Sequence, residues 1–174
     1  MDLKAGAMRL MIDDLYIAQR TQADNHNAQI IAVLQKWLGV SIKVASVEDD
    51  MRHNTDLITA DERRIACRVR LKKYWRAYNR QFTIRHSNAS GMETELDKIR
   101  KGYGDLLFYG FENEAGNVVE NWVIIDLHKF RELYDELLPP VIKQNEDRNN
   151  SLAAFSLDAM PAGIMLHSNW YRSP

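Results

Sequence analysis

The sequence predicts an α/β fold, a single domain of three layers in which a central mixed β-sheet is flanked by helices. Its 174 residues are 45% hydrophobic and 27% charged, the composition and length of a globular chain with one core. Segments with apolar residues at helical spacing alternate with short segments rich in β-branched and aromatic residues. No internal repeat or low-complexity tract interrupts this order. Four or five central strands with helices before, between and after them therefore favour a layered α/β domain.

The first half of the chain is predicted to supply helices and then the first strands. Residues 8–20 and 24–38 carry apolar side chains at helical spacing, and Gly39 can end the second helix. The expected strands are 40–46, 55–60, 63–71 and 81–87, with an acidic loop at 47–54 and a short helix or loop at 72–80. Asp61 and Glu62 form a turn between the second and third strands, which we therefore expect to pair as a hairpin.

The second half is predicted to add a capped helix, two strands, another helix and a terminal strand. Ser90 and Glu93 have the spacing of a capping box and Gly102 can stop a helix, so we expect a helix from about 91 to 101. The remaining elements are strands at 105–111 and 118–127, a helix near 128–138 before Pro139 and Pro140, and a last strand around 163–167 after a polar linker.

Basic side chains are concentrated in the middle of a chain whose formal net charge is −1. From Arg63 to Lys101 there are twelve Lys or Arg and three acids, a local balance of +9. Tyr74, Trp75 and Tyr78 lie among them, with Trp75 the candidate for base stacking. Such a segment is typical of a surface that binds phosphates and stacks on bases. The alternative is a solvated face that pairs with the acidic remainder of the chain.

Alternation along two strands is expected to gather polar groups on one surface. A period of two places Arg68 and Arg70 on the face opposite Cys67, which is the only cysteine and is expected to be a small buried hydrophobe. In the next strand it turns Thr83 and Arg85 outward. If these strands are neighbours, the four side chains share a surface where guanidinium groups can bind phosphate oxygens bidentately.

Two sets of acidic residues are candidates for chemistry. Asp56 opens the strand at 55–60, where a carboxylate can bind a hard cation such as Mg²⁺, although capping of the turn explains it equally well. Glu95 and Lys98 lie next to each other at the border of the expected apolar stripe. An exposed Glu–Lys helix pair is the alternative explanation for them. The apolar stripe itself is expected to consist of Met92, Leu96 and Ile99.

The stretch "NTDLI…RIACRVR…FTIRHSNASGMETELDKIRKGYGDLLFYGF" resembles the restriction-endonuclease-like PD-(D/E)XK nucleases, in particular small phage and prophage members. The resemblance covers roughly residues 24–138 and leaves 139–174 as a C-terminal extension within one domain, 1–174. It implies an αβββαβ core and Mg²⁺ bound by Asp56. The family pattern also has an acid, one residue and a lysine on the following strand, and "IACRVR" contains no acid.

The resemblance implies metal-dependent phosphodiester hydrolysis of DNA at a divergent site. In this hypothesis Asp56 and Glu95 hold Mg²⁺, Lys98 stabilises charge, and Arg68 steadies the phosphate. The expected nucleic-acid-binding residues are Arg70, Lys72, Lys73, Trp75, Thr83, Arg85 and Lys101. The alternatives are a catalytically inactive nuclease-fold protein that binds DNA or a protein partner, and an interaction subunit without affinity for nucleic acid.

The sequence also limits where the chain is expected to function. No run approaches the roughly 20 apolar residues of a membrane span, and no secretory signal pattern opens the sequence. We therefore expect a cytoplasmic protein that does not act in a membrane. Nuclease-like folds often dimerise, so the resemblance adds a homodimer as an expected assembly.

Overall fold

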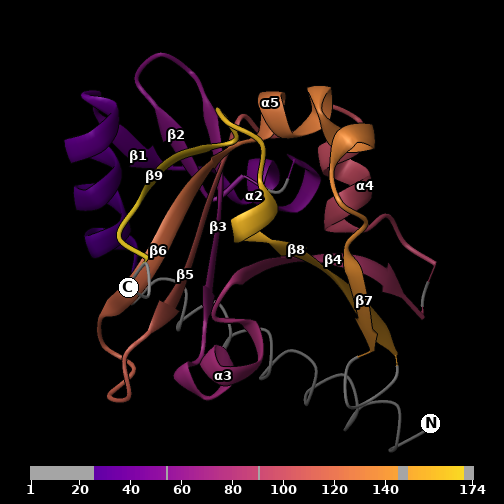
Figure 1. The fold of residues 1–174 in the computed structure, drawn as a ribbon. Coiled ribbons are helices and arrows are strands. Elements are labelled where there is room, and N and C mark those ends of the chain that lie inside the picture. The colour runs from indigo at the N-terminus through magenta and orange to yellow at the C-terminus, as the bar shows by residue number, and fades with distance from the viewer. Residues whose placement is uncertain (1–25, 54, 90, 145–148, 171–174) are drawn as a thin grey trace, which may run out of the picture.

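Short strands and short helices make up the computed structural model, which describes residues 26–53, 55–89, 91–144 and 149–170 (Figure 1). The strands are β1 (Ile42–Val44), β2 (Leu57–Thr59), β3 (Arg64–Arg70), β4 (Gln81–Asn88), β5 (Leu106–Glu112), β6 (Val119–Asp126), β7 (Val141–Gln144), β8 (Asn150–Ser156) and β9 (Met165–Ser168). The α-helices are residues 26–38, α2 (Val47–His53), α3 (Trp75–Tyr78), α4 (Glu95–Arg100) and α5 (Leu127–Glu132). The 3₁₀ helices are η1 (Lys72–Tyr74), η2 (Tyr134–Glu136) and η3 (Leu157–Ala159).

The strands form two sheets. The larger is a six-stranded mixed sheet in the order β1-β2-β3-β5-β6-β9, and the smaller is a three-stranded antiparallel sheet in the order β4-β8-β7. A mixed α/β fold around a mixed central sheet is therefore confirmed, with a second sheet in addition.

The larger sheet is assembled from hairpins and one parallel crossover. β2 and β3 form the predicted antiparallel hairpin, with Leu57 opposite Ile65. The chain then passes through η1, α3, β4 and α4 before β5 pairs in parallel with β3. β5 and β6 form an antiparallel pair that needs Gly110, because a Cβ there would lie 2.6 Å from a methyl group of Val119.

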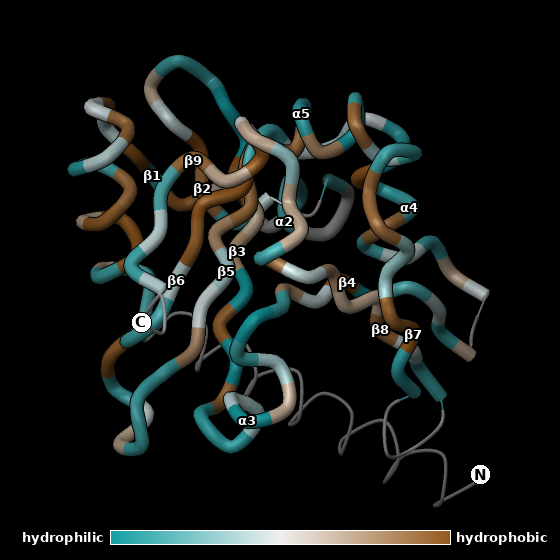
Figure 2. Tube along the Cα trace, viewed as in Figure 1, coloured by the Kyte–Doolittle hydropathy of each residue, from teal (hydrophilic) through white to brown (hydrophobic). Residues whose placement is uncertain are grey.

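Apolar side chains form a core on each face of the six-stranded sheet. Alternation along β5 produces this division, since Leu106 and Phe108 join the core beneath the helix at 26–38 whereas Leu107 and Tyr109 join the other. The second core also contains residues of the three-stranded sheet, α4 and α5. Figure 1 shows these elements on the side of the large sheet away from the helix at 26–38. Hydrophobic residues gather in the central strands, whereas the segment around α3 is largely hydrophilic (Figure 2).

One predicted loop and the predicted start of one helix are wrong. The acidic stretch expected as a loop is helix α2, because Ser46 accepts a hydrogen bond of 3.1 Å from the backbone N–H of Asp49 at its first turn. Helix α4 begins at Glu95 with a capping box made by Thr94 and Asp97, not by Glu93. Met92 consequently precedes the helix and is 71% exposed, so it does not belong to the apolar stripe.

Strand β4 is not a neighbour of β3. It pairs with β8, a strand in the region that the sequence analysis treats as a linker and tail. Residues 141–168 contribute three strands where one was expected, and β9 agrees with the strand predicted around 163–167. The reason is that β8 is recognisable only through its long-range pairing, since "NSLAAFS" lacks a clear alternation of apolar and polar residues.

Other expectations fall outside the described residues or concern the membrane. The helix predicted at 8–20 and the capping role of Ser90 lie outside the part of the chain that the structure describes. No helix within that part has both the length and the apolar character needed to cross a bilayer.

Candidate functional site

Asp56 is held against β3 at the point where β2 begins. Its backbone N–H donates a 2.9 Å hydrogen bond to the carbonyl of Ile65, and its carboxylate accepts one of 2.6 Å from the N–H of Cys67. Burial raises the pKa of Asp56 from 3.8 to about 6, although the hydrogen bond from Cys67 lowers it. The charges of Asp50 and Glu95 raise this pKa further and that of Arg68 lowers it. The carboxylate therefore lies in an environment that disfavours its negative charge.

Glu95 and Arg68 form an ion pair beside this carboxylate. The Nη2 atom of Arg68 lies 2.5 Å from a carboxylate oxygen of Glu95, and the two side chains are 22% and 8% exposed, respectively. The Nη1 atom of Arg68 donates a 3.3 Å hydrogen bond to the carbonyl of Thr83. The backbone N–H of Arg85 donates another 3.3 Å bond to Glu95. Arg68 thus connects β3 of the large sheet with β4 of the small sheet and with the start of α4.

Thr83 is fully buried between the sheets, so its predicted outward orientation is wrong. Its hydroxyl accepts a 2.8 Å hydrogen bond from Arg70 and shares one of 3.2 Å with the hydroxyl of Tyr109. The cause is tertiary, because Tyr109 of β5 covers the side of β4 that a single sheet would have left exposed. Burial also raises the pKa of Tyr109, which keeps its hydroxyl protonated as a potential donor.

The structure brings together some of the predicted site residues. Asp56, Arg68 and Glu95 interact directly or electrostatically, and Thr83 links Arg68 to Arg70. Lys98 is part of the same helix as Glu95, three residues further on, and is partly exposed. Glu95 therefore contacts Arg68 directly, and the charges of both reach Asp56, which is far from Glu95 in the sequence.

Other predicted nucleic-acid contacts lie elsewhere. Lys72 pairs with Glu120 at 2.5 Å, and Lys101, at the end of α4, pairs with Glu93 at 2.5 Å. The side chain of Arg85 is exposed, and only its backbone contacts Glu95. Lys73 is exposed next to the ring of Tyr74, and the ring of Trp75 packs against Phe111 and Trp170, with centroids 5.2 and 5.5 Å away. Trp75 is therefore occupied by protein contacts at one end of the sheet.

Sequence reasoning missed Tyr109 and Asp105, which connect the site to its surroundings. Both belong to "GYGDLLFYGF", where the apolar run hid their roles. Asp105 accepts a 2.7 Å hydrogen bond from the backbone N–H of Arg64, and its other oxygen lies 2.6 Å from Nε2 of His128. It thereby joins the start of β3 to the start of β5. Cys67 packs against the core beneath the helix at 26–38 on the expected face but is only partly buried, and desolvation raises the pKa of its thiol.

The described residues contain no group of three or more His, Cys, Asp or Glu that could hold a metal ion. Asp56 and Glu95 offer oxygen donors only, the kind that Mg²⁺ prefers, and Mg²⁺ commonly uses one or two protein carboxylates with water and substrate phosphate. The donor chemistry therefore fits Mg²⁺ with two protein ligands, one of which is paired with Arg68.

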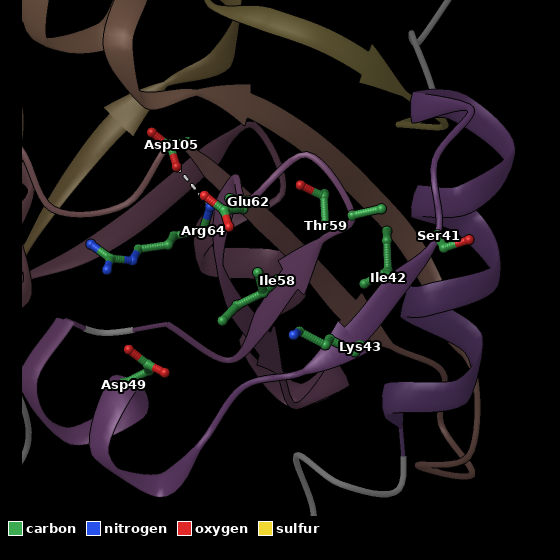
Figure 3. A pocket seen from close by; sticks show the side chains of 10 residues that line it. Ser41, Ile42, Lys43, Asp49, Ile58, Thr59, Glu62, Arg64 and Asp105 are labelled. Atoms are coloured by element: carbon green, nitrogen blue, oxygen red, sulfur yellow. Dashed lines mark hydrogen bonds between the residues drawn. The ribbon is translucent and has the colours of Figure 1, made fainter.

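A separate pocket of about 590 Å³ opens beside the β1–β2 pair (Figure 3). Its lining includes Lys43, Asp49, Glu62, Arg64 and Asp105, so cations and acids are mixed. In Figure 3 the Arg64 side chain extends between Asp49 and Asp105. None of the predicted catalytic residues lines it. The mixture of charges gives this pocket no clear preference for an anion or a cation.

Comparison with known proteins gives no match that would identify the site. No protein-family model matches the chain, and no curated protein matches it. A function must therefore be argued from the geometry and electrostatics of named residues.

The raised pKa of Asp56 predicts a pH-dependent gain in stability for Asp56→Asn. The folded protein keeps the proton to about pH 6 whereas an unfolded aspartate releases it near 3.8, so the wild type loses stability as the pH rises between these values. The variant avoids this loss, which corresponds to about 3 kcal/mol. Chemical unfolding in chelator from pH 4 to pH 8 should show the variant gaining on the wild type. A constant difference between the two proteins would contradict the prediction.

The buried hydroxyl of Thr83 predicts that Thr83→Val is destabilising. The substitution leaves the donors of Arg70 and Tyr109 without this acceptor, which should lower the free energy of unfolding by about 1–3 kcal/mol. Tyr109→Phe, which preserves the bond between Thr83 and Arg70, should cost less. Urea unfolding of both variants tests this order, and a Thr83→Val protein as stable as the wild type would refute it.

Proposed function

We propose that the protein hydrolyses phosphodiester bonds in DNA with Mg²⁺, at a divergent site of the PD-(D/E)XK type. The observation that carries this proposal is the Arg68–Glu95 ion pair, which lies near enough to Asp56 for both of its charges to affect the pKa of that carboxylate. A perturbed carboxylate next to a second carboxylate and a cation is a common feature of catalytic sites.

The order and pairing of elements support the proposal. The helix at 26–38 is followed by the antiparallel strands β1, β2 and β3, and then by α4 and the parallel strand β5. This order is compatible with the αβββαβ core that the resemblance implies if α2, which lies between β1 and β2, and the segment η1, α3 and β4 before α4 are taken as insertions. Asp56 stands immediately before β2, and Arg68 lies on β3.

Each residue has a defined role in the proposed reaction. Asp56 and Glu95 hold Mg²⁺, which when bound polarises the scissile phosphate and lowers the pKa of an attacking water. Arg68 binds a phosphate oxygen, because a guanidinium presents two parallel donors to it. Lys98, three residues beyond Glu95 on α4, stabilises negative charge that develops in the transition state.

In this proposal the Arg68–Glu95 pair couples binding of the metal to binding of the substrate. In the structure one oxygen of Glu95 is engaged by Arg68 at 2.5 Å. Transfer of Arg68 to a phosphate would release that oxygen for the cation, so substrate and metal would bind cooperatively. The charge of Glu95 would then be neutralised in both states, which avoids an unpaired buried carboxylate.

The second candidate is a nuclease-fold protein that binds DNA or a protein partner without cutting. It is favoured by the missing acid on β3, where "RIACRVR" offers only arginines as polar groups, and by the engagement of Glu95 with Arg68. Under this alternative the acidic substitutions leave the affinity for DNA unchanged and have no activity to remove. A homodimer and a cytoplasmic location stay predictions.

Removal of either proposed metal ligand should abolish cutting. Purified protein is incubated with labelled single-stranded, duplex and branched DNA in Mg²⁺, in Mn²⁺ and in chelator. We expect metal-dependent cleavage that falls at least a hundredfold in Asp56→Asn and Glu95→Gln, with DNA affinity within a few fold of the wild type.

Glu93→Gln is the matched control, because Glu93 precedes the same helix but pairs with exposed Lys101. It should cut at the wild-type rate. Cleavage by Glu95→Gln at that same rate would rule out Glu95 as a ligand, and salt-sensitive binding without cutting by the wild type would favour the second candidate.

Arg85 should contribute to binding through its exposed guanidinium. Arg85→Ala is expected to weaken DNA binding and to reduce the slope of log affinity against log salt by about 0.9 if one phosphate contact is lost. Arg80→Ala is the control, since Arg80 pairs with Asp158. Titrations at several salt concentrations measure both slopes, and identical slopes for Arg85→Ala and the wild type would remove Arg85 from the binding surface.

A further inference from the structure

A row of alternating cations and tyrosine rings runs from the end of β3 to β7. The guanidinium carbon of Arg70 lies 4.9 Å from the ring centroid of Tyr74 and 5.1 Å from that of Tyr78. At the two ends, Nζ of Lys73 is 5.0 Å from the Tyr74 ring, and Nζ of Lys143 is 4.2 Å from the Tyr78 ring. The tyrosine–cation row is therefore Lys73, Tyr74, Arg70, Tyr78 and Lys143, in that order.

The cations of this row lack an acidic partner within the described part of the chain. Among the described residues, no ion pair joins Lys73, Arg70 or Lys143 to an acidic side chain. Elsewhere in the described structure Arg63, Arg68, Lys72, Arg80, Lys101 and Lys129 pair with acids, whereas some other cations, such as Arg76 and Arg85, form no ion pair with a described acid either. The row therefore combines excess positive charge with aromatic rings, which is the pairing that single-stranded nucleic acids favour.

The row is connected to the candidate site through Thr83. Arg70 donates to the Thr83 hydroxyl at 2.8 Å, and Arg68 donates to the Thr83 carbonyl at 3.3 Å. Arg68 and Arg70 are two residues apart on β3, about 7 Å along the strand. Arg70 of the row and Arg68 of the ion pair are therefore neighbours along β3, and both bond to Thr83, which is itself buried.

The rings indicate which form of nucleic acid fits. Tyr74 and Tyr78 pack partly on the core and remain partly exposed, and each ring is contacted by two cations of the row. In a duplex the bases are stacked on one another, and only the phosphates would meet the row. An unstacked base can instead replace a cation–π contact with stacking on the ring, leaving the cations for phosphates.

We propose that the tyrosine–cation row binds single-stranded nucleic acid and delivers it to the Asp56–Glu95 site. The row takes the stacking role that the sequence analysis gave to Trp75, whose ring packs against Phe111 and Trp170. As a statement about substrate class, this inference rests on the proposed nuclease function. The binding itself does not, so the two can be tested separately.

The experiment measures binding without cutting. Fluorescence anisotropy in chelator compares a labelled 20-nucleotide oligothymidine with a hairpin duplex carrying a similar number of phosphates. The wild type should bind the single strand at least tenfold more tightly. Tyr78→Leu should weaken this binding about tenfold, whereas Tyr78→Phe, which keeps the ring, should stay within about twofold.

Charge is tested with a matched pair of lysines. Lys143→Met should weaken single-strand binding and reduce the salt slope by about 0.7. Lys129→Met is the control, because Lys129 lies on α5 and pairs with Glu132 at 2.9 Å. Circular dichroism confirms that each variant is folded before its binding is interpreted.

The outcomes separate the two proposals. Equal affinity for duplex and single strand, absence of binding, or wild-type affinity in folded Tyr78→Leu would overturn the inference. Selective single-strand binding that depends on Tyr78 and Lys143 supports it even if no condition yields cleavage, which would count against the nuclease activity alone. Metal-dependent cutting of duplex DNA without single-strand preference would support the activity and overturn the row's role.

Discussion

The ion pair between Arg68 and Glu95 is the interaction on which the rest of the site depends. It joins β3, the start of α4 and, through Thr83, the smaller sheet. Because the Glu95 side chain is only 8% exposed, the loss of either partner would leave a charge with little access to water. Breaking a buried pair in this way typically costs about 3–5 kcal/mol. A substitution in this ion pair therefore affects both the packing of the two sheets and the electrostatics of the site.

Two aspartates show how local environment separates a structural carboxylate from a functional one. Asp97 caps α4, and hydrogen bonds from the backbone and hydroxyl of Thr94 lower its pKa, so its charge stabilises the fold at neutral pH. Asp56 is desolvated, and its raised pKa means that its charge opposes folding at neutral pH. The hydrogen bond from the N–H of Cys67 gives this carboxylate a structural role, and the proposed cation would give it a binding role as well.

Part of the candidate site could be predicted before any contact was known. Asp56 could be selected because it opens a strand, and Arg68 and Arg70 because alternation places them opposite Cys67. Their partners could not be derived from the same patterns. Thr83 was assigned to an exposed surface, since nothing in its own strand indicates that Tyr109 covers it. Trp75 and Lys72 were chosen by residue type, and their contacts with Trp170 and Glu120 come from distant segments.

The sequence by itself determined the local features: the mixture of helices and strands, the β2–β3 hairpin, the terminal strand and the faces of β3. These follow from periodicity and turn residues, which act over a few positions. Only the tertiary structure decided that β4 pairs with β8 in a second sheet and that Arg68 meets Glu95. The physical reason is that strand pairing and ion pairing depend on which distant surfaces become adjacent as the core forms, and no local pattern encodes that choice.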